Sequence, residues 1–371
     1  MKVLHINSYY PYYGVPGFYK NLFDRQLNQG LDISVYVPLD YILENTMDFG
    51  SYTTIVKTHQ RADRYFFHIK HARILNDIVH RYNVNDFRLI HAHSLFSNGY
   101  IAYKLNQRYG VPYIVAVRDT DLNVFFKKMV HLRGLGNRIL QNASKVVFLS
   151  HPYKDITISH YVSKSNVNHI NDKAIVIPNG IDEFWLNNIN SKRDIKITEQ
   201  INLLFVGRIC KRKNPLVTAE ACEKLISNGL AVRFTVVGPI DDRSLLMKLK
   251  RYHFVDYLGV KKKEELLYVY RDNHIFVMPS LSETFGLVYA EALTQGLPVI
   301  YTKGQGFDGQ FNEGEVGYSV DSEDSDDIAN KVLHIMRDYE ELTKKCIERC
   351  WKFDWKHITS QYVQIYNDLV C

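Results

Sequence analysis

Glu283 and Glu291 are the two residues of this chain whose spacing points most directly to chemistry. They lie eight positions apart, with Phe285–Val288 between them, and the preceding run His274–Met278 has the apolar pattern of a buried strand. The following Gly296 and the apolar residues after it indicate a helix stop and a further strand. The pattern therefore predicts one carboxylate in the loop after a strand and a second about two turns into the next helix.

A helix that starts at the end of a parallel strand is suited to binding an anion. Its first backbone N–H groups lack partners and carry the positive end of the helix dipole, which favours phosphate. Carboxylates on either side of a phosphate are better suited to hydroxyl groups than to the phosphate itself. The arrangement matches a nucleotide sugar, which has hydroxyls on the ribose, a diphosphate, and hydroxyls on the sugar. A glycosidase-like acid and base couple is the alternative for two carboxylates seen alone.

A second group of candidate residues follows the strand predicted at Asn202–Val206. Gly207 ends this strand, and Arg208 and Lys213 belong to a run of basic residues before a helix that starts near Pro215. Arginine offers a fork of donors to phosphate oxygens, and lysine adds a mobile charge. A basic loop is often only solvated, but its place on the same sheet edge as the glutamates favours a diphosphate site.

The first half of the chain has no G-x-G-x-x-G or Walker motif after its first strand. It has instead a turn with Gly14 and Gly17 before a helix, which is either an ordinary turn or a close approach to an anion. His91 and His93 face the same side of a strand end, and His93 is a candidate for contact with substrate. Because the spacing implies no third ligand, no metal site is predicted.

Asp119 and Asp121 follow another predicted strand, Tyr113–Arg118. One interpretation is that either carboxylate acts as a base or contacts an acceptor. The alternative is that Asp121 or Thr120 caps a helix.

Short β-branched strands alternate with helical segments throughout the 371 residues, which predicts parallel sheets with crossover helices. The pattern runs twice, so we expect two tandem Rossmann-like, doubly wound α/β domains facing a cleft. The expected domains are residues 1–180, joined by a closing helix at 355–371, and residues 181–354. The polar stretch Asp182–Gln200 is interpreted as the region between them. The predicted strands are Lys2–Asn7, Ile33–Val37, Leu89–His93, Tyr113–Arg118, Lys145–Leu149, Ala174–Ile177, Asn202–Val206, Arg233–Val237, Asp256–Leu258, His274–Met278, Pro298–Tyr301 and Gly317–Val320.

Charge is distributed unequally between the two halves. Residues 1–180 hold 21 Lys or Arg and 12 Asp or Glu, a net charge of +9, and the remainder holds 25 and 28, a net charge of −3. A basic, aromatic half suits an anionic membrane or a polyanionic acceptor, or is a solvated surface without a partner. No nucleic-acid motif is present. The first nine residues are typical of a strand rather than a signal peptide, and five cysteines without Cys-x-x-Cys favour a cytoplasmic location.

Taken together, these motifs resemble those of family 4 glycosyltransferases, which are retaining enzymes of the GT-B fold. The resemblance spans nearly the whole chain, and its most specific element is the pair Glu283 and Glu291 with Phe285-Gly286-Leu287 inside it. The other motifs occur in the expected order, and they are the early glycine turn, His91-Ala92-His93, Pro178–Asp182, and Gly207-Arg208 with Lys213. One departure is the turn Gly14-Val15-Pro16-Gly17, which lacks the paired glycines common in the family.

The resemblance implies roles for matching residues. Arg208 and Lys213 would bind the donor diphosphate, Glu291 the ribose hydroxyls, and Glu283 the transferred sugar. Other implied contacts involve the backbone of Phe285, Gly286, Leu287 and Val288 with the phosphate and sugar, Val260 with the base, His93 with the sugar near the reacting carbon, and Gly14 and Gly17 with donor and acceptor.

The implied reaction is transfer of a hexosyl or N-acetylhexosaminyl group from a nucleotide diphosphate sugar, with UDP as the expected nucleotide, to an acceptor hydroxyl with retention. No metal or cofactor is expected besides the nucleotide-sugar co-substrate. The expected acceptor is a glycan or lipid-linked glycan in bacterial surface polysaccharide assembly, at the inner face of the membrane. The alternatives are a nucleotide-sugar epimerase of the same architecture and a non-catalytic binding protein.

Overall fold

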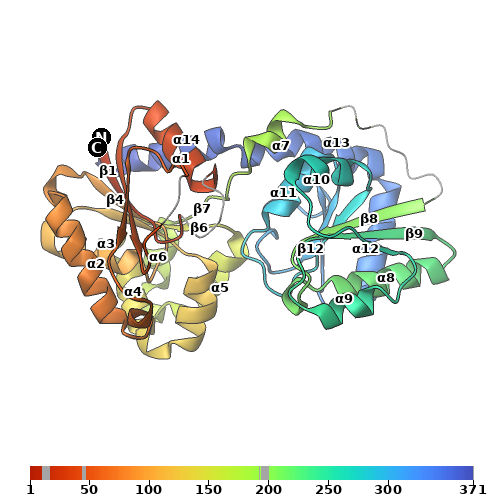
Figure 1. Ribbon diagram of the computed structural model, residues 1–371, viewed down its shortest axis with the longest axis horizontal. Coiled ribbons are helices and arrows are strands. Elements are labelled where there is room, and N and C mark those ends of the chain that lie inside the picture. Colours follow the sequence, from red (N-terminus) through yellow and green to blue (C-terminus); the bar gives the residue numbers. More distant parts are fainter. Residues whose placement is uncertain (11–16, 44–46, 192, 194–199, 371) are drawn as a thin grey trace. The chain divides into compact units, whose positions relative to one another are not determined.

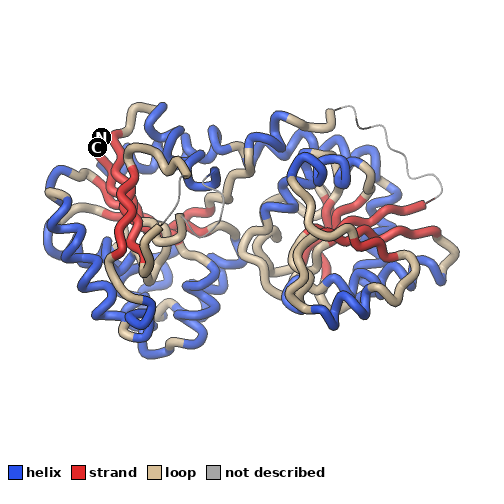
Figure 2. The backbone as a smooth tube through the Cα atoms, viewed as in Figure 1, coloured by secondary structure: helices blue, strands red, loops and turns tan. Residues whose placement is uncertain are grey.

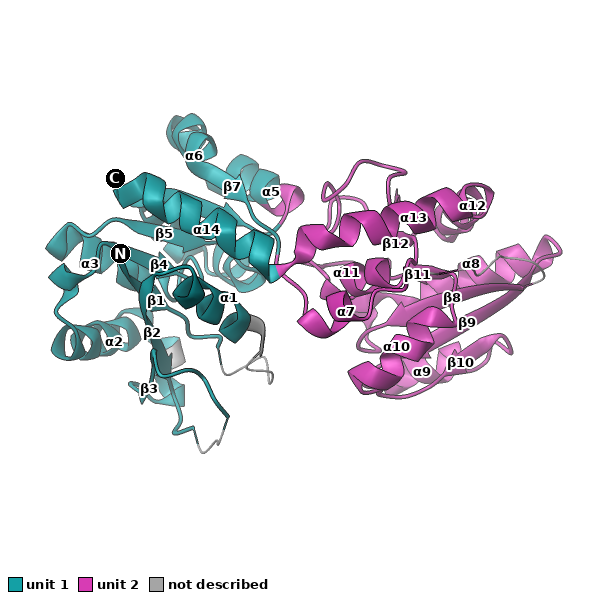
Figure 3. Cartoon of the chain, turned by 90° about the horizontal axis from the view of Figure 1, so that it is seen from above, with its two compact units in different colours: residues 1–149, 154–178, 355–371 teal, residues 150–153, 179–354 magenta. Residues whose placement is uncertain are grey.

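The computed structural model describes residues 1–10, 17–43, 47–191, 193 and 200–370. The chain divides into two compact units, each described here by itself (Figure 3). Unit 1 comprises residues 1–149, 154–178 and 355–371, and unit 2 comprises residues 150–153 and 179–354. The C-terminal segment thus returns to the first unit.

Unit 1 is built on a seven-stranded sheet in which every neighbouring pair is parallel. Its strand order is β3-β2-β1-β4-β5-β6-β7, and helices cover both faces (Figures 1 and 2). The strands are β1 (Lys2–Ile6), β2 (Asp32–Leu39), β3 (Thr53–Lys57), β4 (Leu89–Ala92), β5 (Tyr113–Ala116), β6 (Lys145–Phe148) and β7 (Ala174–Val176). The helices are α1 (Gly17–Asn28), α2 (Phe67–Arg81), α3 (Gly99–Tyr109), α4 (Arg133–Asn142), α5 (His151–Tyr161), α6 (Val167–Lys173) and α14 (Trp355–Val370).

Unit 2 repeats this construction with six parallel strands in the order β10-β9-β8-β11-β12-β13. The strands are β8 (Gln200–Val206), β9 (Ala231–Val237), β10 (Val255–Tyr257), β11 (Ile275–Val277), β12 (Val299–Thr302) and β13 (Gly317–Val320). The helices are α7 (Glu183–Asn187), α8 (Pro215–Ser227), α9 (Arg243–Leu249), α10 (Lys263–Arg271), α11 (Leu287–Thr294), α12 (Ser325–Arg337) and α13 (Tyr339–Arg349).

The order of strands fixes where a ligand site is expected in each sheet. In unit 1 the direction of winding reverses between β1 and β4, and in unit 2 it reverses between β8 and β11. Open α/β sheets bind ligands beside the carboxyl ends of the strands at such a switch point. A ligand site of unit 2 is therefore expected at the loops after β8 and β11.

Two predictions about the elements need correction. Strand β3 was not predicted, because it is a half-exposed edge strand and lacks the continuous apolar run of its neighbours. The stretch Asp182–Gln200 is not an irregular connection throughout, since its start forms α7, capped by the Asp182 carboxylate, which accepts from Phe184 N at 2.8 Å. Arg193 is bonded to the Gln295 carbonyl at 3.0 Å, so this part of the stretch is fastened to unit 2.

Helix α14 closes unit 1 by packing against α1 (Figure 3). It contributes a row of buried aromatic side chains to the core of this unit. Trp355, Tyr362 and Tyr366 are each at most 4% exposed. Gln26 donates to the Tyr366 hydroxyl at 3.1 Å, and that hydroxyl lies 2.6 Å from His91 Nδ1 on β4. A buried polar chain thus joins α1, β4 and α14.

Replacing Tyr366 by phenylalanine removes the middle of this chain and leaves buried polar atoms of Gln26 and His91 without partners. We expect Tyr366→Phe to lower the free energy of unfolding by about 2 kcal/mol, because a buried polar group left without its hydrogen bond costs roughly 1–3 kcal/mol. Urea unfolding followed by circular dichroism measures this. Tyr268→Phe is the matched control, since Tyr268 is 69% exposed, and equal effects of the two variants would contradict the assigned role.

Candidate functional site at the carboxyl edge of the second sheet

Two strand ends of unit 2 approach each other unusually closely beside the switch point. Gly207, after β8, donates to the Val237 carbonyl at 2.9 Å. Gly238, after β9, has φ +140°, and a Cβ on it would lie 2.0 Å from the Gly207 carbonyl oxygen. Only glycine therefore fits at 238, and this fit sets the path of the basic loop that begins at Arg208.

Arg208 lies at the start of this loop and is held by Asp241, a carboxylate that was not predicted from the sequence. Its guanidinium makes two bonds to Asp241, Nε to Oδ2 at 2.7 Å and Nη2 to Oδ1 at 2.9 Å. Each partner favours the charged form of the other, raising the pKa of Arg208 and lowering the pKa of Asp241. The Arg208 side chain is 60% exposed, and exposed ion pairs contribute little to the stability of a fold. A phosphate can therefore compete with Asp241 for the guanidinium.

Lys213 forms the main contact between the two loops that flank the switch point. Its ammonium is paired with Glu283 Oε2, and the two side chains are only 11% and 12% exposed. The loops are also joined through their backbones, because Leu281 N donates to the Arg212 carbonyl at 2.8 Å. The Arg212 guanidinium donates in turn to the Ser282 carbonyl at 2.8 Å. The predicted residues Lys213 and Glu283 are thus brought together, in direct contact.

Helix α11 begins four residues after Glu283 with an N-terminus that no side chain caps. Gly286 precedes it with φ +77°, and a Cβ there would meet the Tyr289 ring at 2.5 Å. Phe285 is buried, whereas Leu287 and Val288 are half-buried. Uncapped N–H groups and the positive helix end make this a suitable place for an anion.

A third loop, after β12, supports Glu283 from the other side. Gln305 Oε1 accepts from Glu283 N at 2.9 Å, and Gly306 N donates to the Glu283 carbonyl at 2.6 Å. A Cβ at Gly306 would lie 2.1 Å from the Thr284 carbonyl carbon, so the close contact requires glycine. Gln305 and Gly306 were missed in the sequence, although two glycines after a strand on this edge are a usable signal.

Glu291 lies on α11, where its side chain is close to residues of α7 and α10. Tyr270 OH is 3.3 Å from Glu291 Oε2. Burial raises the pKa of Glu291 to about 7, with hydrogen bonds from Tyr270 and Trp185 opposing this and the Asp182 charge adding to it. The residue as a whole is half-buried, and it lies on the same helix as the uncapped N-terminus. Val260, the predicted base contact, follows Gly259 in the loop after β10 and is 69% exposed.

Two of the predicted site residues of unit 1, His93 and Asp121, are buried, unlike Arg208 and Val260 of unit 2. His93 is 1% exposed, with Nε2 3.1 Å from His5 Nδ1 and its ring stacked on His91 at 4.0 Å, so its side chain is not presented to a ligand. His5, His91 and His93 each offer a ring nitrogen within 4.8 Å of the others. Among the residues that the structure describes, these three have the geometry to hold a metal ion. Burial lowers the pKa of all three, and the Arg118 charge lowers the pKa of His91 and His93 further. This neighbouring cation opposes a metal ion there.

Asp121 accepts hydrogen bonds from the backbone. It is fully buried, and its oxygens accept from the N–H groups of Leu95 at 2.9 Å, Phe96 at 3.0 Å and Arg118 at 2.8 Å. Burial raises its pKa to about 6 despite these bonds. Its burial and these three bonds favour a structural role, and a direct contact of Asp121 with an acceptor stays a prediction.

The remaining acceptor-side residues are Asp119, Gly14 and Gly17. Asp119 is half-buried, and its Oδ1 accepts from Asn123 at 2.7 Å. Gly17 is the first residue of α1, and Gly14 lies outside the described residues.

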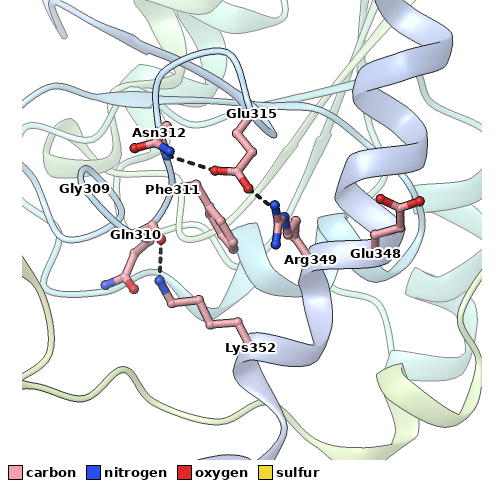
Figure 4. Close-up of a pocket in the computed structure, with 8 residues that line it drawn as sticks. All are labelled: Gly309, Gln310, Phe311, Asn312, Glu315, Glu348, Arg349 and Lys352. Carbon is pink, nitrogen blue, oxygen red and sulfur yellow. Dashed lines mark hydrogen bonds and ion pairs between the residues drawn. The ribbon is translucent and has the colours of Figure 1, made fainter.

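A separate hollow of unit 2 contains none of the predicted site residues (Figure 4). It is lined by Gly309, Gln310, Phe311, Asn312, Glu315, Glu348, Arg349 and Lys352. Its cations are engaged, Arg349 with Glu315 at 2.6 Å and Lys352 with the Gln310 carbonyl. These contacts indicate a structural role. None of the described helices combines the length and hydropathy needed to cross a bilayer.

Two family models match the chain and together span most of it. The model described as Glycosyltransferase Family 4 matches residues 14–183, and the model described as Glycosyl transferases group 1 matches residues 187–352. Among curated proteins, an uncharacterised glycosyltransferase of Methanocaldococcus jannaschii is 24% identical over 100% of this chain and 99% of its own length. The D-inositol 3-phosphate glycosyltransferase of Corynebacterium urealyticum is 27% identical over 48% of this chain and 46% of its own length.

Solved structures with the same architecture include a sucrose-phosphate synthase from Thermosynechococcus elongatus. It is 18% identical, with a TM-score of 0.75 over 100% of this chain and 99% of that one. Anabaena HepE in complex with UDP is 15% identical, with a TM-score of 0.69 over 99% of this chain and 100% of that one. These likenesses concern the fold, and they confirm the predicted pair of doubly wound domains of the GT-B type.

The raised pKa of Glu291 predicts a pH dependence of stability. Between about pH 4.5 and 7 the folded protein holds a proton on Glu291 that the unfolded chain has released, so stability falls as pH rises through this window. Glu291→Gln removes the cost of ionising this buried carboxyl. We expect the free energy of unfolding of the variant to exceed that of the original protein by roughly 2 kcal/mol at pH 8, with a smaller difference at pH 5. Urea unfolding at both pH values measures it. A difference that does not change with pH would show that Glu291 has an ordinary pKa.

Proposed function

Because this chain belongs to glycosyltransferase family 4, we propose that it moves a hexosyl or N-acetylhexosaminyl group from a UDP-sugar to an acceptor hydroxyl, with retention of anomeric configuration. The observation that carries the proposal is the meeting of Lys213, Glu283 and the uncapped start of α11 at the switch point of the second sheet. This place suits a diphosphate with a hydroxyl-bearing group beside it.

The main barrier to sugar transfer is the departure of a charged diphosphate. Arg208 and Lys213 lie in the same loop, and the positive end of α11 follows the loop that Lys213 contacts. Positive groups fixed where charge develops lower the barrier because they need not reorganise during the reaction. In this proposal these groups stabilise the leaving diphosphate, and no metal is required.

Donor binding requires two existing pairs to change partners. Arg208 exchanges the Asp241 carboxylate for phosphate oxygens, which costs little because the pair is exposed. Lys213 shifts toward the diphosphate while Glu283 becomes an acceptor for a sugar hydroxyl. Glu283 keeps its position because its backbone N–H and C=O are bonded to Gln305 and Gly306.

The proposed reaction takes place on one face of the sugar. The bond from the anomeric carbon to the diphosphate oxygen breaks, a bond to the acceptor oxygen forms on the same face, and the acceptor proton passes to the leaving phosphate. A protein base is unnecessary on this route. The burial of Asp121 and His93 supports this, since neither side chain is exposed to exchange a proton with an acceptor.

The nucleoside end of the donor is assigned to Glu291 and Val260. Glu291, on α11, accepts hydrogen bonds from the ribose hydroxyls, and the exposed Val260 contacts the base. UDP is supported by the similar structure of Anabaena HepE, which is a complex with UDP. No cofactor takes part.

Unit 1 is proposed to bind the acceptor, a glycan or lipid-linked glycan of surface polysaccharide assembly. The net charge of +9 over residues 1–180 supports peripheral contact with an anionic membrane, and a cytoplasmic location is part of the same proposal.

A nucleotide-sugar screen tests the proposal. We expect UDP and one UDP-sugar to stabilise the protein against heat by about 2.7 kcal/mol at ~100 times the dissociation constant, unchanged by EDTA. Incubation with the donor alone separates transfer from epimerisation, because an epimerase converts the donor without an acceptor. No stabilisation by any nucleotide sugar would reject the function.

The two glutamates should affect different steps. We expect Glu291→Ala to weaken UDP binding, since it removes the proposed ribose contact, and Glu283→Ala to retain UDP binding while transfer falls. Titration with UDP and turnover with the identified donor measure the two effects. The roles would be refuted if both variants lost UDP binding equally.

Arg208 gives the sharpest test of the leaving-group assignment. We expect Arg208→Ala to lower turnover by ~100-fold, comparable to removing one oxyanion donor. Lys211→Ala is the matched control, because Lys211 is an exposed cation of the same loop, and its turnover should stay close to that of the original protein. Near-normal turnover of Arg208→Ala, or an equal loss in both variants, would remove Arg208 from the mechanism.

A further inference from the structure

Unit 1 exposes a group of large apolar side chains around the start of α2 and the segment after β5. Among the described residues, Tyr65 is 73% exposed, Phe66 59%, Ile69 50%, Val124 39% and Val130 58%. Where exposed apolar side chains gather into a patch on a folded domain, they often mark an interaction site.

These residues belong to two segments that contact each other. The Phe67 ring of α2 lies 6.1 Å from the Phe125 ring, and each of these residues directly follows an exposed one, Phe66 and Val124. Met129 N donates to the Val124 and Phe125 carbonyls at 3.2 and 3.1 Å, which places Val130 next to the same turn. The exposed groups therefore flank one aromatic contact.

The surroundings of this contact are basic. Arg61, Lys127 and Lys128 are exposed, and no Asp or Glu occurs between Leu122 and Lys154. The nearby Asp63 is buried and paired with Arg73 at 2.5 Å, so it contributes little negative charge to the surface. We call Arg61, Tyr65, Phe66, Ile69, Val124, Lys127, Lys128 and Val130 the aromatic–basic surface.

The segment that carries half of this surface is held from below. Residues Asp121–Phe126 form a π-helix, and π-helical turns are frequent at functional sites. Asp121 fixes the start of the turn through its three backbone bonds, and Phe126 is fully buried. The turn is thus anchored by its buried residues while Val124, Lys127 and Lys128 remain exposed.

We propose that the aromatic–basic surface docks this protein onto an anionic lipid bilayer, with the apolar side chains in the interfacial layer and the cations at the headgroups. Aromatic and aliphatic side chains favour that layer, and lysines near it are attracted to anionic lipids. A protein partner would need acidic groups to match the cations, whereas a bilayer supplies both the apolar and the anionic component. The inference rests on the proposed function in one respect, that a docked unit 1 would meet a lipid-linked acceptor.

Vesicle flotation of the full chain tests the proposal. We expect the protein to float with vesicles of phosphatidylcholine and phosphatidylglycerol at low salt, and to float much less with phosphatidylcholine alone or at high salt, where the charges are screened. Failure to float with the anionic vesicles at low salt would overturn the proposal, and equal flotation with both kinds of vesicle would overturn its electrostatic part.

Two variants locate the contact. Tyr65→Ser/Phe66→Ser/Ile69→Ser removes apolar groups, and Lys127→Glu/Lys128→Glu reverses two charges; we expect each to lower the partition coefficient by about tenfold or more. The matched controls lie on unit 2. Met247→Ser/Tyr268→Ser removes side chains that are 68% and 69% exposed, and Lys248→Glu/Lys250→Glu makes the same charge change. Losses as large in the controls as in the surface variants would overturn the assignment.

UDP binding of the same variants separates this inference from the proposed function. We expect the aromatic–basic variants to bind UDP with unchanged affinity, since the donor residues lie in unit 2. Flotation without any binding of nucleotide sugars would reject the glycosyltransferase proposal while the membrane contact stands. Binding of nucleotide sugars without flotation would reject the membrane contact while the glycosyltransferase proposal stands.

Discussion

The contact between Lys213 and Glu283 is the interaction on which the candidate site depends. It joins the loop after β8 to the loop after β11 across the point where the strand order of the second sheet reverses. Both side chains are largely buried, and removing one partner of a buried pair leaves the other charge uncompensated, which is strongly destabilising. The pair thus keeps a cation and a carboxylate at the carboxyl edge, where a ligand can take over either partner.

Glycine permits the close backbone contacts that surround this pair. Gly238 lets the ends of β8 and β9 approach, and Gly306 lets the loop after β12 contact Thr284. A side chain at either position would collide with backbone rather than with a flexible neighbour. The site is therefore built mainly by the packing of four strand ends, and its charged side chains are placed by that packing.

Much of the fold could be predicted because its signals are local. Parallel strands buried on both faces are written as short apolar runs, and β8, β9, β11 and β12 of unit 2 follow that pattern. Strand β3 was not predicted, because it is a half-buried edge strand without a continuous apolar run. Helix α7 escaped because its stretch is polar on average, although Trp185 and Leu186 anchor it in unit 2.

Residue type and spacing alone determined that Arg208, Lys213 and Glu283 follow strands on one sheet edge, since parallel strands bring their carboxyl ends together. Only the tertiary structure decided what each charge does in the folded chain. Asp241 holds Arg208 although it lies 33 positions away, and Asp121 supports two loops. A sequence pattern records which groups are available, whereas burial and the partners that packing supplies decide which of them remain free to meet a ligand.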